Sequence, residues 1–223
     1  MQPFQRAFVD LLVQYEVVRF GSFTLKSGRK SPYFVNAGQL RTGDAIGRLG
    51  QAFAARILAS EVGCDLVFGP AYKGVPLAVA TSIGLAARGV DVAFGFDRKE
   101  VKDHGEGGKF VGTAPADGMR VVVVDDVITS GQSIREAVEL VRAAADVTVT
   151  AVVVAVDRQE RGTGSKSTLA ELRDELGVAV LPIVTIRELA GDLAVREIGG
   201  RILVDAEQRA AIDAYLAEHG GTA

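Results

Sequence analysis

The N-terminal part of the chain carries apolar side chains at helical spacing, interrupted by extended pieces. Over residues 4–18 an apolar side chain recurs every three or four positions, which predicts an amphipathic helix. Two short extended pieces, 22–26 and 32–35, come after it. Thr42 is placed to cap a second helix, because an apolar stripe with a helical period begins directly after it.

From residue 65 onward, short apolar runs alternate with helical segments. The predicted strands are 65–69, 90–96, 120–124, 147–156 and 178–186, and the predicted helices are 75–88, 133–144, 168–176 and a last one from Asp205 to about His219. Valine-rich strands that alternate with helices are typical of a parallel sheet covered on both faces. The sequence therefore predicts a single α/β domain over residues 1–223. The last four residues are expected to fray.

Two polar, glycine-rich segments do not fit this alternation. They are 97–113 and the shorter 157–167, and neither has an apolar period. Both are expected to be loops, and a loop as long as the first is usually a lid, a binding loop or a disordered segment.

Composition and charge narrow the class of protein. The 223 residues carry a net charge of −3, which argues against a globally basic nucleic-acid binder. Cys64 is the only cysteine and there are two histidines, so an intrachain disulfide and a cysteine or multi-histidine metal site are excluded. No apolar stretch is long enough for a membrane helix, and the N-terminus lacks the form of a signal peptide. We expect a soluble, cytoplasmic protein with no nucleic-acid or membrane partner.

The most informative stretch is Arg120–Ala137, RVVVVDDVITSGQSIREA. Four valines predict a buried strand, two aspartates follow at its carboxyl end, and small residues lead into a helix. Ligands bind outside the carboxyl ends of parallel strands, and a glycine turn there presents backbone N–H groups to a phosphate. Carboxylates repel phosphate but suit sugar hydroxyls or a hydrated Mg²⁺. Such a pocket accepts a phosphate and a vicinal diol together, as in a ribose phosphate.

A strand end followed by a helix cap explains the two aspartates equally well when they are taken alone. The whole unit VVVVDDVITSGQS is more specific, and it is neither a Walker A loop nor a GxGxxG motif. It resembles the phosphoribosyl-diphosphate-binding signature of the type I phosphoribosyltransferases, in which a hydrophobic strand, paired acids, small residues and glycine follow at fixed offsets.

Further segments resemble one branch of that family, the orotate phosphoribosyltransferases. They read FTLKSGRKSPYFVN from residue 23, FGPAYKGVPL from 68, DRKEVKDHGEGG from 97 and DRQERG from 157. The resemblance implies an α/β fold of the type I kind, with a central parallel sheet flanked by helices. A small N-terminal hood, to which about residues 1–40 contribute, would cover the base.

The resemblance also implies the reaction. Ribose 5-phosphate would pass from 5-phosphoribosyl 1-diphosphate to orotate, giving orotidine 5′-phosphate and diphosphate in pyrimidine synthesis. Mg²⁺ is the implied cofactor, held mainly through substrate and water rather than by direct protein ligands. The implied assembly is a homodimer in which the loop 98–109 reaches the neighbouring subunit's site.

The site residues implied by the resemblance form three groups. Those expected to stabilise the reacting sugar and the leaving diphosphate are Lys102, His104, Asp125 and Asp126. Those expected to bind phosphoribosyl diphosphate are Lys26, Tyr72, Lys73, Arg98, Lys99, Lys102, His104, Asp125, Asp126, Val127, Ile128, Thr129, Ser130, Gly131, Gln132 and Ser133. Those expected to bind orotate are Phe34, Val35, Thr129 and Arg158.

Several of these residues can also be explained without any contact to a substrate. A solvated charged loop accounts for 98–109 equally well by composition, because its acids nearly balance its cations. Arg158 suits a bidentate contact with the orotate carboxylate, and an ion pair with Glu160 explains it equally from the sequence. Val35 departs from the Phe-Phe pair common in the family, which matters only if side chains rather than backbone bind the base. The TSGQS turn departs from a TAGTA-like form, a change that keeps the backbone phosphate donors.

Two other functions remain open on the sequence. One is a phosphoribosyltransferase for a different base, because the strand–turn–helix signature would be the same. The other is a regulator that senses phosphoribosyl diphosphate without catalysis and binds nucleic acid, although the sequence has no concentrated basic patch outside the loop.

Overall fold

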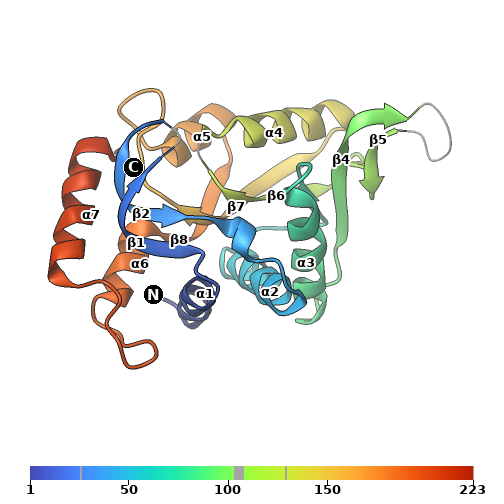
Figure 1. Cartoon of the computed structure of the whole chain (residues 1–223). Helices are drawn as coiled ribbons and strands as arrows, with labels where there is room; N and C mark the ends of the chain where they lie inside the picture. The colour runs from blue at the N-terminus through green and yellow to red at the C-terminus, as the bar shows by residue number, and fades with distance from the viewer. Residues whose placement is uncertain (26, 103–107, 129, 223) are drawn as a thin grey trace.

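A six-stranded sheet forms the centre of the protein (Figure 1). The structure is a computed structural model that describes the chain except residues 26, 103–107, 129 and 223, and it describes residues 100–102 by their backbone alone. In the order in which they lie in the sheet, the strands are β5 (Gly108–Gly112), β4 (Ala93–Lys102), β3 (Leu66–Gly69), β6 (Arg120–Val127), β7 (Thr148–Asp157) and β8 (Ala179–Thr185). All pairs are parallel except β4–β5 at one edge.

Helices cover both faces of this sheet, as the alternating pattern predicts. They are α1 (Pro3–Gln14), α2 (Gly43–Ala59), α3 (Gly74–Ala86), α4 (Gln132–Ala144), α5 (Thr168–Leu176), α6 (Ile186–Leu193) and α7 (Ala206–His219), with a 3₁₀ turn at Ala37–Gln39. Strand β6 has buried valines on both faces. Val122 and Val124 belong to the apolar cluster shared with α1–α3, whereas Val121 and Val123 pack with α4 and α5. A two-sided hydrophobic strand is what a covered parallel sheet requires.

The N-terminal hairpin stands apart from the central sheet. Strands β1 (Val18–Thr24) and β2 (Lys30–Val35) pair only with each other, antiparallel. Tyr33 of β2 is fully buried, and its hydroxyl donates a hydrogen bond to the Arg158 carbonyl just beyond β7. The hairpin therefore lies at the carboxyl end of the sheet, while α1 packs against α2 and β8.

Two expectations about the elements were wrong, and one helix was not predicted. Segment 97–113 is no loop, because most of it continues β4 and forms β5 as a hairpin at the sheet edge. Helix α6 was not expected, although Thr185 and Glu188 form a capping box at its start. The tail does not fray over residues 220–222: the Gly221 amide donates to the Gln159 carbonyl, and the Thr222 amide donates to the Ser165 carbonyl. None of the helices in the described part of the chain is long and apolar enough to cross a membrane.

Candidate functional site

The chain changes direction across the sheet between β3 and β6, which lie side by side. After β3 it continues to β4 on one side, and after β6 it continues to β7 on the other. In open α/β sheets, ligands bind in the crevice outside the carboxyl ends of the strands at such a switch point. The crevice is bordered by the loop from Gly69 to Gly74 and, after β6, by the described residues Ile128, Ser130 and Gly131.

Asp125 and Asp126 lie next to each other near the carboxyl end of β6. Both residues are buried. Asp125 Oδ2 accepts a hydrogen bond from Ser133 Oγ at 2.8 Å, and Asp125 Oδ1 accepts one from the Asp126 amide at 2.9 Å. Burial raises the pKa of Asp125, and the Ser133 hydroxyl opposes that shift by bonding the charged form.

Asp126 reaches across the switch point to Lys73. Lys73 Nζ donates to Asp126 Oδ2 at 2.7 Å, and this hydrogen bond raises the pKa of Lys73. The lysine side chain is 74% exposed, whereas that of Asp126 is 11% exposed. An ammonium group and two carboxylates therefore meet at one place, which is what a ligand with both hydroxyl and phosphate groups requires.

The turn after β6 presents backbone donors. Gly131 precedes α4 with φ at +75°, in the left-handed region that favours glycine, and a Cβ there would lie 2.9 Å from a Leu172 methyl carbon. The amide groups of the first turn of α4 have no partner within the helix, so with the helix dipole they form a site for an anion. Of the neighbouring residues, Ile128 is buried and Val127 pairs with Val156 of β7.

The loop after β3 is held by close backbone packing. A Cβ on Gly69 would lie 2.0 Å from the Gly74 carbonyl oxygen, so both residues need to be glycine. The Ala71 amide donates to Asp97 Oδ1 at 2.6 Å, which ties the loop to β4. Tyr72 projects from it, 75% exposed. Asp97 was not among the predicted site residues. Its place at the end of the apolar half of β4 is the same signal that singled out Asp125.

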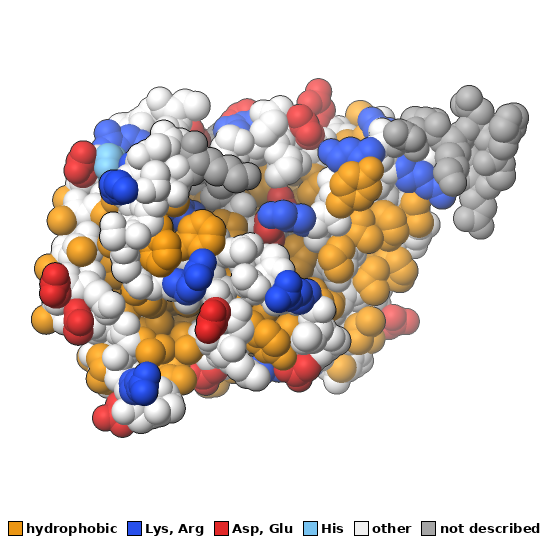
Figure 2. Space-filling view, viewed as in Figure 1, with side chains coloured by type: hydrophobic (Ala, Val, Ile, Leu, Met, Phe, Trp, Pro, Cys, Tyr) orange, Lys and Arg blue, Asp and Glu red, His pale blue; other side chains and the backbone are white. Residues whose placement is uncertain are grey.

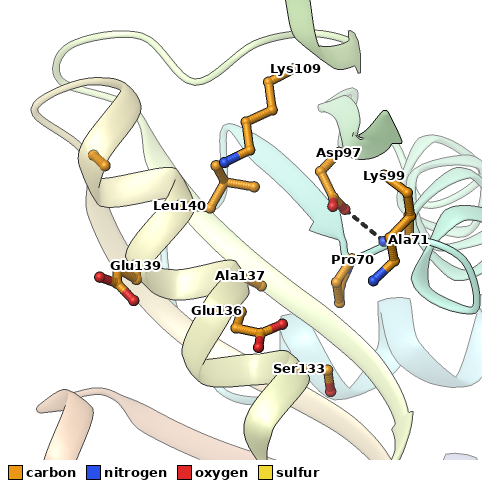
Figure 3. A pocket seen from close by; sticks show the side chains of 11 residues that line it. Pro70, Ala71, Asp97, Lys99, Lys109, Ser133, Glu136, Ala137, Glu139 and Leu140 are labelled. Carbon is orange, nitrogen blue, oxygen red and sulfur yellow. Dashed lines mark hydrogen bonds between the residues drawn. The ribbon is translucent and has the colours of Figure 1, made fainter. Parts of the chain in front are cut away.

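A pocket of about 430 Å³ opens beside this loop. Lys99 and Lys109 enter it from the β4–β5 hairpin, and Ser133 and Glu136 enter it from α4 (Figure 3). The pocket brings cations of the predicted loop close to the start of α4, although Glu136 and its neighbour Glu139 make its lining mixed in charge.

Not every predicted loop residue can be placed. Arg98 and Lys99 lie on β4, and the hairpin extends at the end of the sheet opposite α7 (Figure 1). Strand β4 ends at Lys102, of which only the backbone is described. The predicted site residues His104, Lys26 and Thr129 lie outside the described residues.

Of the residues predicted to bind orotate, Phe34 and Val35 end β2, directly after Tyr33, and Arg158 follows β7. Phe34 faces Phe23, with ring centroids 5.7 Å apart, and Arg19 lies over both rings. Val35 faces the other way and packs against the main core. Because neighbouring residues of a strand point to opposite faces, only Phe34 can offer its side chain to a base there, and Val35 can offer its backbone.

Arg158 is buried beneath the hairpin. Its Nε and Nη2 both donate to Glu160 Oε1, with Nε at 3.1 Å, and its guanidinium carbon lies 4.8 Å from the Tyr33 ring centroid. Burial lowers the pKa of Arg158, but the Glu160 carboxylate outweighs that and the pKa is raised overall. The ion pair considered from the sequence is therefore present. It uses only one edge of the guanidinium, so it does not exclude a substrate contact on the other edge.

Comparison with known proteins agrees with this architecture. Residues 36–173 match the phosphoribosyl transferase domain family. Because that is more than half of the chain, the protein belongs to this family of enzymes.

Closer relatives narrow the family. The chain is 48% identical to the orotate phosphoribosyltransferase of Halorhodospira halophila over 222 residues, which cover 99% of this chain and 92% of the relative. Its fold is similar to that of the orotate phosphoribosyltransferase of Francisella tularensis, with a TM-score of 0.83 and 32% identity over 96% of this chain and 99% of the other. A Mycobacterium tuberculosis orotate phosphoribosyltransferase in complex with 5-phospho-α-D-ribosyl 1-diphosphate has a TM-score of 0.61 and 25% identity over 83% of this chain and 98% of the other. The chain belongs to the orotate phosphoribosyltransferases.

Proposed function

We propose that this protein transfers ribose 5-phosphate from 5-phosphoribosyl 1-diphosphate to N1 of orotate, releasing diphosphate, as a step of pyrimidine nucleotide synthesis. Family membership supports the reaction. The observation that carries the proposal within this structure is the meeting of Asp125, Asp126, Lys73 and the start of α4 at the switch point.

The proposed binding mode follows from the charges of the substrate's phosphates and of the side chains at the switch point. The turn from Thr129 to Ser133 would hold the 5′-phosphate through its backbone N–H groups and hydroxyls. The two aspartates would accept hydrogen bonds from the ribose hydroxyls. The loop that carries Tyr72 and Lys73 would face the diphosphate, so Lys73 would exchange Asp126 for a diphosphate oxygen when the substrate binds.

The donor set fits a Mg²⁺ ion that is carried mainly by the substrate. The described residues contain no group of three or more acidic, histidine or cysteine side chains able to hold a metal. Mg²⁺ usually keeps several waters and binds through one or two carboxylates and substrate phosphates, so the diphosphate, water and the two aspartates suffice. When bound, the ion supplies positive charge that offsets the charge on the leaving diphosphate.

Orotate would lie between the hairpin and the end of β7. The Phe34 ring would cover one face of the base, and the free edge of Arg158 would bind its carboxylate through two parallel N–H groups. Thr129 would lie between base and sugar. In the reaction the bond from C1′ to the diphosphate oxygen breaks and its electron pair leaves with diphosphate. The C1′–N1 bond forms, and the N1 proton passes to water.

Charge develops on the sugar while the bond to diphosphate breaks. The transition state is oxocarbenium-like, so the buried carboxylates at positions 125 and 126 would stabilise it. Lys102 and His104 would stabilise the departing diphosphate. No covalent intermediate with the protein is required, and the acceleration would come from positioning and electrostatics.

A turnover assay tests this function directly. With orotate, phosphoribosyl diphosphate and Mg²⁺ present, we expect diphosphate release, and omission of any one component should stop it. Orotate, uracil, adenine and hypoxanthine would be compared as acceptors. Turnover with another base alone would overturn the assignment to orotate, and binding of phosphoribosyl diphosphate with no acceptor used would point to a sensor. The cytoplasmic location stays a prediction.

The same proposal includes a homodimer. Ile83 on α3 is 63% exposed, and Val90 and Phe94 are also exposed beside it. The Ser82 hydroxyl donates to the Ala93 carbonyl, which holds the end of α3 against the start of β4. Figure 2 shows hydrophobic side chains gathered over α3 and β4 next to the β4–β5 hairpin. An apolar surface at the base of the predicted catalytic loop supports a second copy there, with the loop 98–109 reaching the partner's site.

We expect Lys102→Ala to lower kcat about 100-fold, because one cationic donor to the leaving group is lost from the transition state. The melting temperature should stay unchanged, since the hairpin lies at the sheet edge. Lys166→Ala, which removes an exposed ion pair with Asp174, is the matched control and should keep wild-type kcat. Full activity of Lys102→Ala would contradict the role of the loop.

Mixed dimers test whether the loop acts across the interface. Subunits carrying Lys102→Ala would be mixed with subunits carrying Asp125→Asn and Asp126→Asn, each of which keeps about a hundredth of wild-type activity or less when alone. If the loop serves the neighbouring site, random assortment restores roughly a quarter of wild-type activity, because half of the dimers hold one complete site. If the loop serves its own site, no activity returns.

A further inference from the structure

The carboxylate of Glu160 lies where three separate elements meet. Besides Arg158, the Glu160 Oε1 atom accepts a hydrogen bond from the Tyr215 hydroxyl at 2.8 Å and one from the Tyr33 hydroxyl at 3.4 Å. Glu160 Oε2 lies 3.6 Å from Arg29 Nη1. The Glu160 carboxylate therefore contacts the β1–β2 hairpin, the segment after β7 and helix α7. The Glu160 side chain is only 18% exposed.

The two tyrosines are suited to remain donors. Burial, followed by the charge of Glu160, raises the pKa of Tyr33. Burial and the hydrogen bond to Glu160 raise the pKa of Tyr215 as well. Both hydroxyls therefore stay protonated at neutral pH and hold the carboxylate in place, with the rings themselves packed edge to face at 5.5 Å.

This arrangement determines how the guanidinium of Arg158 is presented. Glu160 takes the edge formed by Nε and Nη2, and the Tyr33 ring covers one face. The edge formed by Nη1 and the second hydrogen of Nη2 has no acceptor among the residues that the structure describes. That edge has the parallel pair of N–H groups that binds a carboxylate in a bidentate manner.

The C-terminal tail also holds the backbone segment that carries Arg158 and Glu160. The Arg161 amide donates to the His219 carbonyl at 3.0 Å, and the Gly221 amide donates to the Gln159 carbonyl at 3.1 Å. The backbone bonds flank Glu160 on both sides, so α7 and the tail restrain both its main chain and its side chain.

We propose that Glu160 is a positioning residue that acts through Arg158, and that α7, through Tyr215, thereby tunes the affinity of the site for a base that bears a carboxylate. This inference rests on the proposed function and extends it to a helix for which the sequence offered no role. The simpler alternative is that Glu160 only neutralises a buried arginine.

Steady-state kinetics of Glu160→Gln would test the proposal. The amide keeps the size of the side chain but weakens the bonds to the guanidinium, so we expect the KM for orotate to rise about 10- to 100-fold. The KM for phosphoribosyl diphosphate and kcat at saturating orotate should change less than about threefold. Glu197→Gln, at an exposed position outside this cluster, is the matched control and should match the wild type.

Tyr215→Phe provides a second variant that keeps the ring in the core. Loss of one hydroxyl should raise the KM for orotate about 3- to 10-fold, with the melting temperature lowered only slightly. If Glu160→Gln does not fold, the KM of Tyr215→Phe for orotate tests the positioning role by itself.

A double-mutant cycle with Arg158→Ala separates positioning from mere stability. If Glu160 acts through Arg158, adding Glu160→Gln to Arg158→Ala should not raise the KM for orotate further. Equal effects of Glu160→Gln on both substrates, additive effects in the cycle, or an unchanged KM for orotate in Tyr215→Phe would overturn the proposal. An inactive wild type would instead refute the proposed function itself.

Discussion

Replacing Asp125 and Asp126 together by asparagine is expected to lower kcat/KM for phosphoribosyl diphosphate by at least about 1000-fold. The amides keep the size of the carboxylates and can still bond the ribose hydroxyls, but they lose the negative charge that faces a cationic sugar in the transition state. The fold should persist. Burial disfavours the charged form of Asp125, so a neutral side chain there costs little, and the exposed Lys73 ammonium can be hydrated once its partner is gone.

Asp146→Asn is the matched control for this pair. Asp146 is exposed and precedes β7, so it lies at the amino end of the sheet, far from the proposed site. Its variant should keep wild-type kinetics, and melting curves of both variants should resemble that of the wild type. Residual activity above about a tenth of the wild-type value in the double variant would contradict the ribose-binding role, because one lost transition-state contact already costs more.

Arg158→Ala is expected to lower kcat/KM for orotate about 1000-fold and to leave the KM for phosphoribosyl diphosphate nearly unchanged. Two hydrogen bonds to a charged carboxylate are lost together, and each contributes about 1.5–3 kcal/mol. The substitution also leaves Glu160 without its main cationic partner, with Arg29 3.6 Å away as the remaining cation. Kinetics with each substrate varied in turn would measure the effects on orotate and on phosphoribosyl diphosphate separately. A melting curve would report any loss of stability.

Arg161→Ala controls for the loss of an arginine from the same segment. The Arg161 side chain is exposed and donates to the Glu218 carbonyl, away from the Glu160 carboxylate. Its variant should use orotate as the wild type does. A proportional rise in the KM of both substrates for Arg158→Ala would show general damage rather than loss of a carboxylate contact.

The central motif could be predicted because its signals are local. The valines of β6, the two aspartates, Gly131 and the start of α4 follow one another within a single strand–turn–helix unit, and each residue type has a direct backbone consequence. Helix α5 lies where its apolar pattern predicted it, and helix α7 lies where Asp205 was predicted to cap it. The structure adds Ser167 as the N-cap of α5.

The β4–β5 hairpin was missed because an edge hairpin needs no apolar period. The pairing of Asp97 with Phe110 and of Lys102 with Gly108 is set by backbone hydrogen bonds to the neighbouring strand, so it needs no alternation of apolar side chains along 97–102. The C-terminal tail was missed for a related reason. Its glycines have no side chains to pack, and its order comes from backbone bonds to the segment after β7.

The sequence alone determined which chemical groups the protein has and the local turn that presents them, because a strand end, a glycine and a helix start are consecutive residues. Only the tertiary structure decided which distant groups meet. Lys73 and Asp126 are 53 residues apart in sequence, and Glu160 and Tyr215 are 55 apart, yet each pair is hydrogen bonded. Such contacts depend on how the layers of helices and strands pack, and no local pattern of residues encodes that packing.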